Sequence, residues 1–379
     1  MTVTLREQAY EKEAVLYMAL ELSKRSWKVG FSDGSRRRQV TVKGGDREDL
    51  MRQVKRAKEK FGLESDCRVV SCYEAGRDGF WLHRYLQAQG IDNVVVDAAS
   101  MEVSRRRRRA KTDRLDMEML LRGLIRYTAG EARVWSVVRV PSVEHEDGQR
   151  LYRERARLIK ECVGHTNRIK SLLVTQGIEL EKVRKDFDRV LEGMRRWDGT
   201  ALGADLKQDL LREWRRWGLV HEQIEELEAV QRARVAQAVA GPELLVDQLI
   251  ALKSVGWQTG WVLVMEIFAW RQFNNRRQVT GCVGLAPTPY RSGDSEREQG
   301  ISKAGNRRVR KALIELAWLW IYYQPDSELT QWFQRRWGCQ GARARRVGIV
   351  ALARRLLIAL WRYLETGEIP AGAVLQRSR

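Results

Sequence analysis

The hydrophobic pattern of the first residues predicts a hairpin of strands. Val15–Leu22 is mostly apolar and is typical of a buried strand, and Trp27–Phe31 alternates between apolar and polar positions. Asp33 and Gly34 then form a turn signal before a return strand over Arg38–Val42. The chain is therefore expected to begin with antiparallel strands.

Strand and helix signals alternate after this hairpin. We expect a charged amphipathic helix over 45–61, a short strand over 67–72, a helix over 79–89 and a valine-rich strand over 93–96. Antiparallel strands followed by strand–helix alternation predict a mixed sheet with helices on its faces. We assign residues 1–140 to this α/β domain.

The segment 141–240 has few strand signals and is rich in Arg, Glu, Leu and Lys. Apolar residues recur at helical spacing on each side of a turn at 199–203. They are Leu151, Leu158, Ile169, Leu172 and Leu173, then Leu206, Leu210, Trp214, Trp217, Ile224, Leu227 and Val230. This pattern predicts a helical hairpin or coiled coil suited to dimerisation or to gripping an extended ligand, and an ordinary helical spacer fits it equally well.

The last segment, 241–379, is again helical but richer in aromatic residues and glycine. Its longest apolar stretch, Val347–Leu364, is interrupted by Arg354, Arg355 and Arg362, which indicates an amphipathic buried helix and not a membrane span. A glycine-containing turn at 254–260 is compatible with a phosphate-binding helical hairpin, but a plain helix–helix turn is favoured. The overall fold class is therefore α/β followed by all-α.

The formal net charge of +20 over 379 residues favours a polyanionic partner, for which nucleic acid is the usual case. Five scattered cysteines without a Cys-x-x-Cys pair, and four histidines, argue against zinc and against a disulfide framework. No signal peptide precedes the first strand, so a cytoplasmic protein that does not enter a membrane is expected.

Four acidic residues stand at the ends of predicted elements. Glu21 ends the first strand, Glu74 follows the strand at 67–72, and Asp113 and Asp116 begin an amphipathic helix on one face of it. Carboxylates arranged in this way can converge on Mg²⁺, with Mn²⁺ as a substitute, and support phosphoryl transfer. Taken singly, each is as well explained as a helix cap or a dipole partner.

Cations lie next to this acidic set. Five consecutive arginines, with a lysine two positions further on, directly precede the aspartate pair, and we favour a nucleic-acid backbone contact over a solvated loop. These residues are Arg105, Arg106, Arg107, Arg108, Arg109 and Lys111.

The segment Arg291–Arg310 combines hydroxyl residues, turn glycines and cations just before an apolar helix. Backbone amides at a helix start form an anion site, and a serine beside such a site is a candidate nucleophile. Three serines compete for that role: Ser292, Ser295 and Ser302. The cations expected to hold a phosphate backbone are Lys303, Arg307, Arg308 and Arg310.

In order and spacing, the four acids resemble those of the DEDD transposases of the IS110/IS1111 insertion-sequence family. The block Val283–Gly293, followed by Gly300–Asn306 and Arg310, is similar to the second conserved block of that family. The resemblance covers nearly the whole chain and selects Ser292, because the nucleophilic serine of the family precedes a glycine after the Gly-Leu-x-Pro segment. The chain departs from the family at Glu21, where the first acid is usually Asp.

The resemblance implies an RNase H-like domain of the RuvC type and Mg²⁺-dependent cleavage of DNA with a covalent phosphoserine intermediate. It also implies a structured guide (bridge) RNA that pairs with double-stranded donor and target DNA, and a homo-oligomer, a dimer that assembles into a tetramer. Two alternatives remain open from the residues alone. One is a RuvC-like nuclease that uses water, and the other is a nucleic-acid-binding protein without catalysis.

Overall fold

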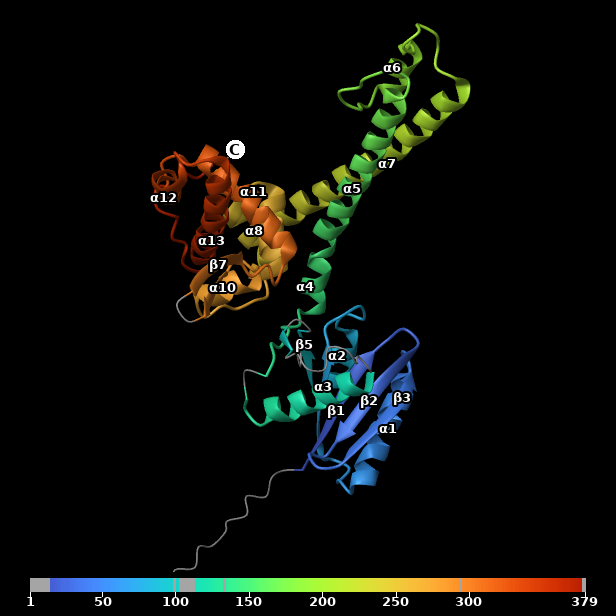
Figure 1. The fold of residues 1–379 in the computed structure, drawn as a ribbon, viewed down its shortest axis with the longest axis vertical. Coiled ribbons are helices and arrows are strands. Elements are labelled where there is room, and N and C mark those ends of the chain that lie inside the picture. The colour runs from blue at the N-terminus through green and yellow to red at the C-terminus, as the bar shows by residue number, and fades with distance from the viewer. Residues whose placement is uncertain (1–13, 98–99, 102–112, 132–133, 293–294, 377–379) are drawn as a thin grey trace, which may run out of the picture. The chain divides into compact units, whose positions relative to one another are not determined.

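The structure is a computed structural model that describes residues 14–97, 100–101, 113–131, 134–292 and 295–376. At 113–116, 289–292 and 295–299 it describes the backbone alone. Tertiary contacts divide the chain into two compact units, 1–140 and 141–379 (Figure 1). The segments predicted as separate over 141–240 and 241–379 thus fall within one unit.

The N-terminal unit contains a five-stranded mixed sheet in the order β3-β2-β1-β4-β5. Its strands are β1 (Val15–Leu22), β2 (Ser26–Ser32), β3 (Arg37–Lys43), β4 (Arg68–Glu74) and β5 (Asp92–Val96). β1 pairs antiparallel with β2 and parallel with β4, while β2–β3 is antiparallel and β4–β5 is parallel. The predicted mixed sheet is confirmed.

Helices cover both faces of this sheet. They are α1 (Arg47–Phe61), α2 (Trp81–Ala88) and α3 (Asp113–Thr128). The side chain of Asp46 accepts a hydrogen bond from Asp49 N and begins α1, and Gly62 ends it in the left-handed conformation. Apolar residues of α1 and α2 pack on the face of Leu20, and those of α3 pack on the face of Ala19. Alternation along β1 therefore supplies two separate cores.

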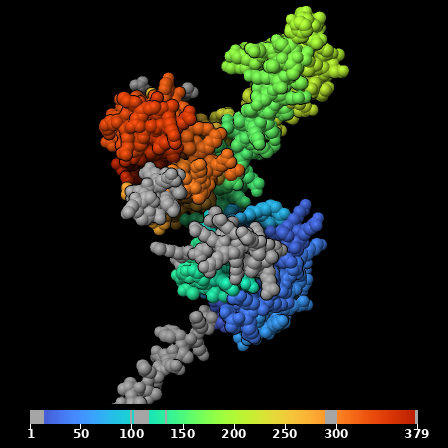
Figure 2. All heavy atoms as spheres, viewed as in Figure 1, coloured from blue at the N-terminus to red at the C-terminus, as the bar shows by residue number. Residues whose placement is uncertain are grey.

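The C-terminal unit begins with a long helical arm. Its helices are α4 (Val143–Gly148), α5 (Arg150–Val174), α6 (Phe187–Gly193) and α7 (Ala204–Ala236). α5 and α7 run antiparallel, with α6 at the tip, and pack along their length (Figures 1 and 2). Polar contacts join the two helices, such as the hydrogen bond between His165 Nδ1 and Glu213 Oε2 at 2.7 Å. The expected helical hairpin is present within one chain, and a coiled coil between protomers stays a prediction.

Further helices and one hairpin of strands complete this unit. They are α8 (Pro242–Ile250), α9 (Trp257–Leu263), the π-helical turn η3 (Val264–Phe268), α10 (Arg276–Cys282), β6 (Pro287–Ser292), β7 (Ser295–Ile301), α11 (Arg307–Tyr323), α12 (Glu328–Trp337) and α13 (Ala342–Thr366). A core containing Leu263, Leu313, Trp320 and Leu356 joins the helices. In the described part of the chain, no helix is long and apolar enough to cross a membrane.

Candidate active-site elements

Glu21 and Glu74 lie at neighbouring carboxyl ends of two parallel strands. β1 pairs with β4 up to Leu20 and Tyr73, and each glutamate is the next residue of its strand. Residues at matching register positions of parallel strands point to the same face of the sheet. Glu21 is half-buried and Glu74 is exposed, so the pair stands at the rim of the sheet.

The face that carries the two glutamates is the one covered by α3. Ala19 and Cys72, each two positions earlier on its strand, share a buried cluster with Leu120 of α3. Burial, together with the charge of Glu74, raises the pKa of the Cys72 thiol. Cys72 therefore remains a neutral, packed side chain and not a thiolate ligand.

Helix α3 runs back along the strands toward their starts. Its last residue, Thr128, lines a shallow hollow together with Arg68, the first residue of β4. The first turn of α3 therefore lies toward the carboxyl ends of the strands. Asp113 and Asp116 belong to this first turn by sequence, and their side chains lie outside the described residues.

The predicted metal ligands are described only in part. Within the part of the chain that the structure describes, no three His, Cys, Asp or Glu residues form a group able to hold a metal ion. The described side chains include those of Glu21 and Glu74 but not those of Asp113 and Asp116. The set consists of carboxylates, the donors that Mg²⁺ prefers, and its described members share one sheet edge, so the residues fit that ion. The cations Arg105–Arg109 and Lys111 lie outside the described residues.

Ser292 ends β6, and its register partner across the hairpin is Ser295, the first residue of β7. The two residues between them lie outside the described part of the chain. The sequence did not predict this hairpin because Pro287 and Pro289 argue against a strand. A two-stranded hairpin tolerates proline, since each strand has an edge that needs no partner, and the register shifts between these two prolines.

The base of the hairpin is held by main-chain hydrogen bonds between 302–306 and 282–286. Lys303 N donates to Gly284 O at 3.1 Å, and Asn306 N donates to Cys282 O at 2.9 Å. Gly284 has a φ of +68°, and a Cβ there would lie 1.9 Å from the carbonyl oxygen of Ala304. Only glycine permits this approach, so the loop before α11 is fixed against the loop before β6.

Arg310 was predicted to grip a phosphate backbone, but its hydrogen bonds lie inside the protein. Its Nη1 donates to Val283 O at 2.8 Å and to Ala304 O at 3.4 Å. The half-buried side chain thus ties together the loops on both sides of the hairpin. In contrast, Lys303 and Arg307 are exposed, as is Arg308.

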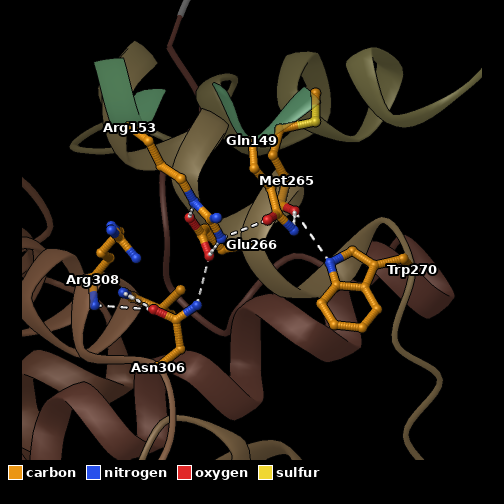
Figure 3. Close-up of polar contacts among 8 residues, drawn as sticks. Gln149, Arg153, Met265, Glu266, Trp270, Asn306 and Arg308 are labelled. Carbon is orange, nitrogen blue, oxygen red and sulfur yellow. Dashed lines mark hydrogen bonds and ion pairs between the residues drawn. The ribbon is translucent and has the colours of Figure 1, made fainter. Parts of the chain in front are cut away.

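A buried carboxylate connects the start of α11 to the arm (Figure 3). Glu266, in η3, is 2 % exposed and accepts from Arg153 of α5, Nε to Oε1 at 2.9 Å and Nη2 to Oε2 at 3.0 Å. Asn306 Nδ2 donates to the same Oε2 at 2.7 Å. The hydrogen bonds to Glu266 raise the pKa of the Arg153 guanidinium, so Arg153 brings a positive charge to the buried carboxyl group.

Asn306 performs a second task at the same place. Its Oδ1 accepts from the main-chain N of Arg308 and of Val309, which caps the first turn of α11. Sequence reasoning missed Glu266 and Asn306. The available signals were a single carboxylate inside the apolar run Trp261–Phe268 and an Asn one residue before a helix.

Comparisons with known proteins place this geometry in context. Residues 246–331, which include Glu266, Ser292 and Asn306, match a family model described as the transposase IS116/IS110/IS902 family. A Sinorhizobium fredii protein named as a transposase, y4rJ, is 42 % identical over 376 residues, covering 95 % of this chain and 94 % of that protein.

Two further relatives are more distant. The Sinorhizobium fredii protein y4qE, also named as a transposase, is 30 % identical over 276 residues, covering 72 % of this chain and 63 % of that protein. The transposase for insertion sequence element IS1111A of Coxiella burnetii is 26 % identical over 274 residues, or 69 % of each chain.

Proposed function

Because this chain belongs to the IS116/IS110/IS902 family of transposases, we propose that it is a DNA recombinase that acts through a covalent serine–phosphate linkage. Ser292 is the nucleophile, and Glu21, Glu74, Asp113 and Asp116 form the metal-binding half of the site. The observation that carries the proposal is the position of Glu21 and Glu74. They lie in register on neighbouring strands, at the edge of the sheet where α3 begins.

The order of the sheet supports an RNase H-like N-terminal unit of the RuvC type. An antiparallel β1–β2–β3 meander followed by parallel β4 and β5 gives that unit one carboxyl edge, at which β1 and β4 end side by side. A site built on the ends of adjacent strands holds two carboxylates at fixed spacing. In this chain Glu21 takes the place of the usual Asp, and its extra methylene lets its carboxylate reach further beyond the half-buried strand end.

The proposed reaction exchanges one phosphate ester for another. Ser292 Oγ attacks a DNA phosphorus, an Oγ–P bond forms as a sugar O–P bond breaks, and the released sugar hydroxyl takes the proton that the serine loses. Attack of a different strand's hydroxyl on the phosphoserine reverses the step and rejoins DNA without ATP. Mg²⁺, when bound, supplies charge that stabilises the phosphoryl oxygens.

The four acids and Ser292 belong to different compact units. The proposed reaction therefore requires both units to act on one phosphate. We propose that a homo-oligomer, a dimer that forms a tetramer on DNA, supplies this assembly. In support, several large apolar side chains of the arm are exposed, among them Ile159, Val163, Leu219 and Val230.

Choice of target is proposed to rest with a structured guide RNA, while the protein holds the backbones of donor and target DNA through Arg105–Arg109, Lys111, Lys303, Arg307 and Arg308. The chain's net charge of +20 supports binding to backbones. In this scheme the guide RNA reads the sequence by pairing, and the protein recognises backbone and shape.

The test of the nucleophile is a search for a covalent adduct. The protein is incubated with Mg²⁺, labelled DNA spanning the element's ends and RNA transcribed from the element, and then denatured. We expect a protein–DNA adduct that Ser292→Ala abolishes. Ser295→Ala is the matched control, because Ser295 is the register partner of Ser292, and it should retain the adduct.

The same assay separates the alternatives. Hydrolysed DNA ends without an adduct would favour a RuvC-like nuclease that uses water. Tight binding without Mg²⁺-dependent cleavage would favour a non-catalytic binding protein. An adduct that persists in Ser292→Ala would assign the nucleophile to another residue, and cleavage that survives Asp113→Ala with Asp116→Ala would remove those two from the metal site.

A further inference from the structure

The end of α12 and most of α13 carry positive charge and no negative charge of their own. No Asp or Glu lies between Glu328 and Glu365. The same interval contains eight arginines: Arg335, Arg336, Arg343, Arg345, Arg346, Arg354, Arg355 and Arg362. We call these eight residues the arginine face. All but Arg345 and Arg354 are exposed, and those two are half-buried.

Charge alone does not mark a binding surface, and the arm of the same unit shows why. There, arginines are neutralised by carboxylates, as in Arg157–Glu161 at 2.5 Å and Arg155–Glu228 at 2.6 Å. Both helices of the arginine face are described throughout, and none of its eight arginines has a carboxylate within ion-pair distance. Their positive charges repel one another, and an anionic ligand would offset this repulsion.

Two of these arginines lie over tryptophan rings that contact each other edge to face. The guanidinium of Arg355 lies 3.9 Å from the ring centroid of Trp332. The ring centroids of Trp332 and Trp337 are 4.9 Å apart. The guanidinium of Arg336 lies 5.3 Å from the ring centroid of Trp337. A Cβ at Gly348 would lie 2.6 Å from Trp337 Cδ2, so the Trp337 ring packs directly against the main chain of α13 at this glycine. Stacking fixes a guanidinium by its face and leaves its N–H edge available for phosphate oxygens.

Three further arginines lie along one side of α13. Arg343, Arg354 and Arg362 lie on the opposite side of the helix from buried residues such as Leu352 and Leu356. Arg354 Nε is shielded from water and has no hydrogen-bond acceptor in the described structure. From Arg343 to Arg362 the helix rises about 28 Å, which corresponds to roughly eight base pairs of a duplex.

We propose that the arginine face binds the phosphate backbone of double-stranded DNA independently of its sequence. The face lies beyond 246–331, the segment that matches the family model, and it contains none of the residues assigned to the reaction. Guanidinium groups without a carboxylate partner can donate to phosphate oxygens, and contacts to phosphates carry no sequence information. The choice of DNA as the occupant rests on the proposed function, because DNA is the substrate of that reaction.

The test compares two triple variants of the full-length protein by fluorescence anisotropy on a 30-base-pair DNA of random sequence. Arg343→Gln, Arg355→Gln and Arg362→Gln remove three cations of the face. Arg157→Gln, Arg168→Gln and Arg212→Gln remove three from the arm, which the structure pairs with Glu161 and Asp209. Both variants change the net charge equally, so general attraction is matched.

Each phosphate contact contributes about 0.9 to the slope of log K against log salt. We expect the face variant to lower that slope by roughly two to three and to weaken binding about 100-fold near 0.1 M salt. The arm variant should keep the parent slope. Equal losses in both variants, or an unchanged slope in the face variant, would overturn the proposal, as would a loss confined to an RNA duplex of the same length.

A double-mutant comparison tests the stacking. Trp332→Leu keeps an apolar side chain under Arg355 but removes the ring face, and it should weaken binding about as much as Arg355→Gln. The two changes combined should cost little more than either one alone, whereas additive losses would contradict the stack. All measurements can be made in Ser292→Ala, so that failure of the arginine face and failure of the serine chemistry are observed separately.

Discussion

The side-chain amide of Asn306 donates a hydrogen bond to the buried Glu266 carboxylate at 2.7 Å while its carbonyl oxygen caps helix α11. One residue thus fixes the start of α11 to the π-helical turn and, through Glu266, to Arg153 of the arm. The loop that ends at Asn306 begins where the Ser292 hairpin ends. The network therefore joins the arm to the base of the hairpin.

Asn306→Asp should destabilise the protein by about 2–4 kcal/mol, because it keeps the capping acceptor but places a second carboxylate against buried Glu266. Unfolding in urea, followed by circular dichroism, measures the change. Asn275→Asp is the matched control, since Asn275 caps α10 with its side-chain oxygen in the same way. That variant should change stability by less than about 0.5 kcal/mol, and equal losses in the two variants would show that the Glu266 contact contributes nothing.

Arg310→Ala should lower the free energy of unfolding by about 1–3 kcal/mol, because Val283 O loses its donor in a half-buried place. Arg307→Ala, at an exposed position of the same helix, should leave stability within about 0.5 kcal/mol of the parent. Thermal unfolding of both variants distinguishes a structural arginine from a surface one. A stable Arg310→Ala would return Arg310 to the set of proposed DNA contacts.

Gly284→Ala should cost more than about 3 kcal/mol, because the new Cβ meets the Ala304 carbonyl in addition to a strained φ. Gly300→Ala provides the comparison. Gly300 has a φ of +86°, and a Cβ added there would meet nothing within 4 Å, so alanine should cost only about 1 kcal/mol. Similar losses in urea unfolding at both positions would mean that the close approach at Gly284 is not needed.

Acid should weaken the arm through Glu213. Burial raises the pKa of this carboxyl, but the hydrogen bond from His165 and the charge of Arg216 outweigh burial and hold the pKa below its ordinary value of 4.5. A carboxyl with a lowered folded-state pKa stabilises the fold at pH above its unfolded pKa, and this contribution is lost as pH falls through the folded pKa.

The variant Glu213→Gln should therefore be less stable than the parent near neutral pH and should lose less stability as the pH falls below about 4.5. Urea unfolding at a series of pH values measures both curves. Parallel curves for parent and variant across the acid range would show that the His165–Glu213 contact makes no contribution.

The sequence by itself determined the elements whose periodicity is strong. β1 has the predicted bounds Val15–Leu22, and the mixed sheet and the long helices of the arm appear where alternation and helical spacing indicated them. These features follow from local patterns, because burial of one face requires period 2 in a strand and period 3.6 in a helix. Family membership likewise followed from the order and spacing of residues along the chain.

Tertiary structure decided what depends on pairing between distant segments. The register of β1 and β4 brings Glu21 beside Glu74 across 53 positions of sequence, which no local pattern specifies. Arg310 donates to two main-chain carbonyls, Val283 O and Ala304 O, that come together only in the folded loops. The strand containing Ser292 forms despite its prolines because it pairs along one edge only. The hydrogen-bond partners of a charged or polar group are set by the folded loops around it, so its role could be read only after folding.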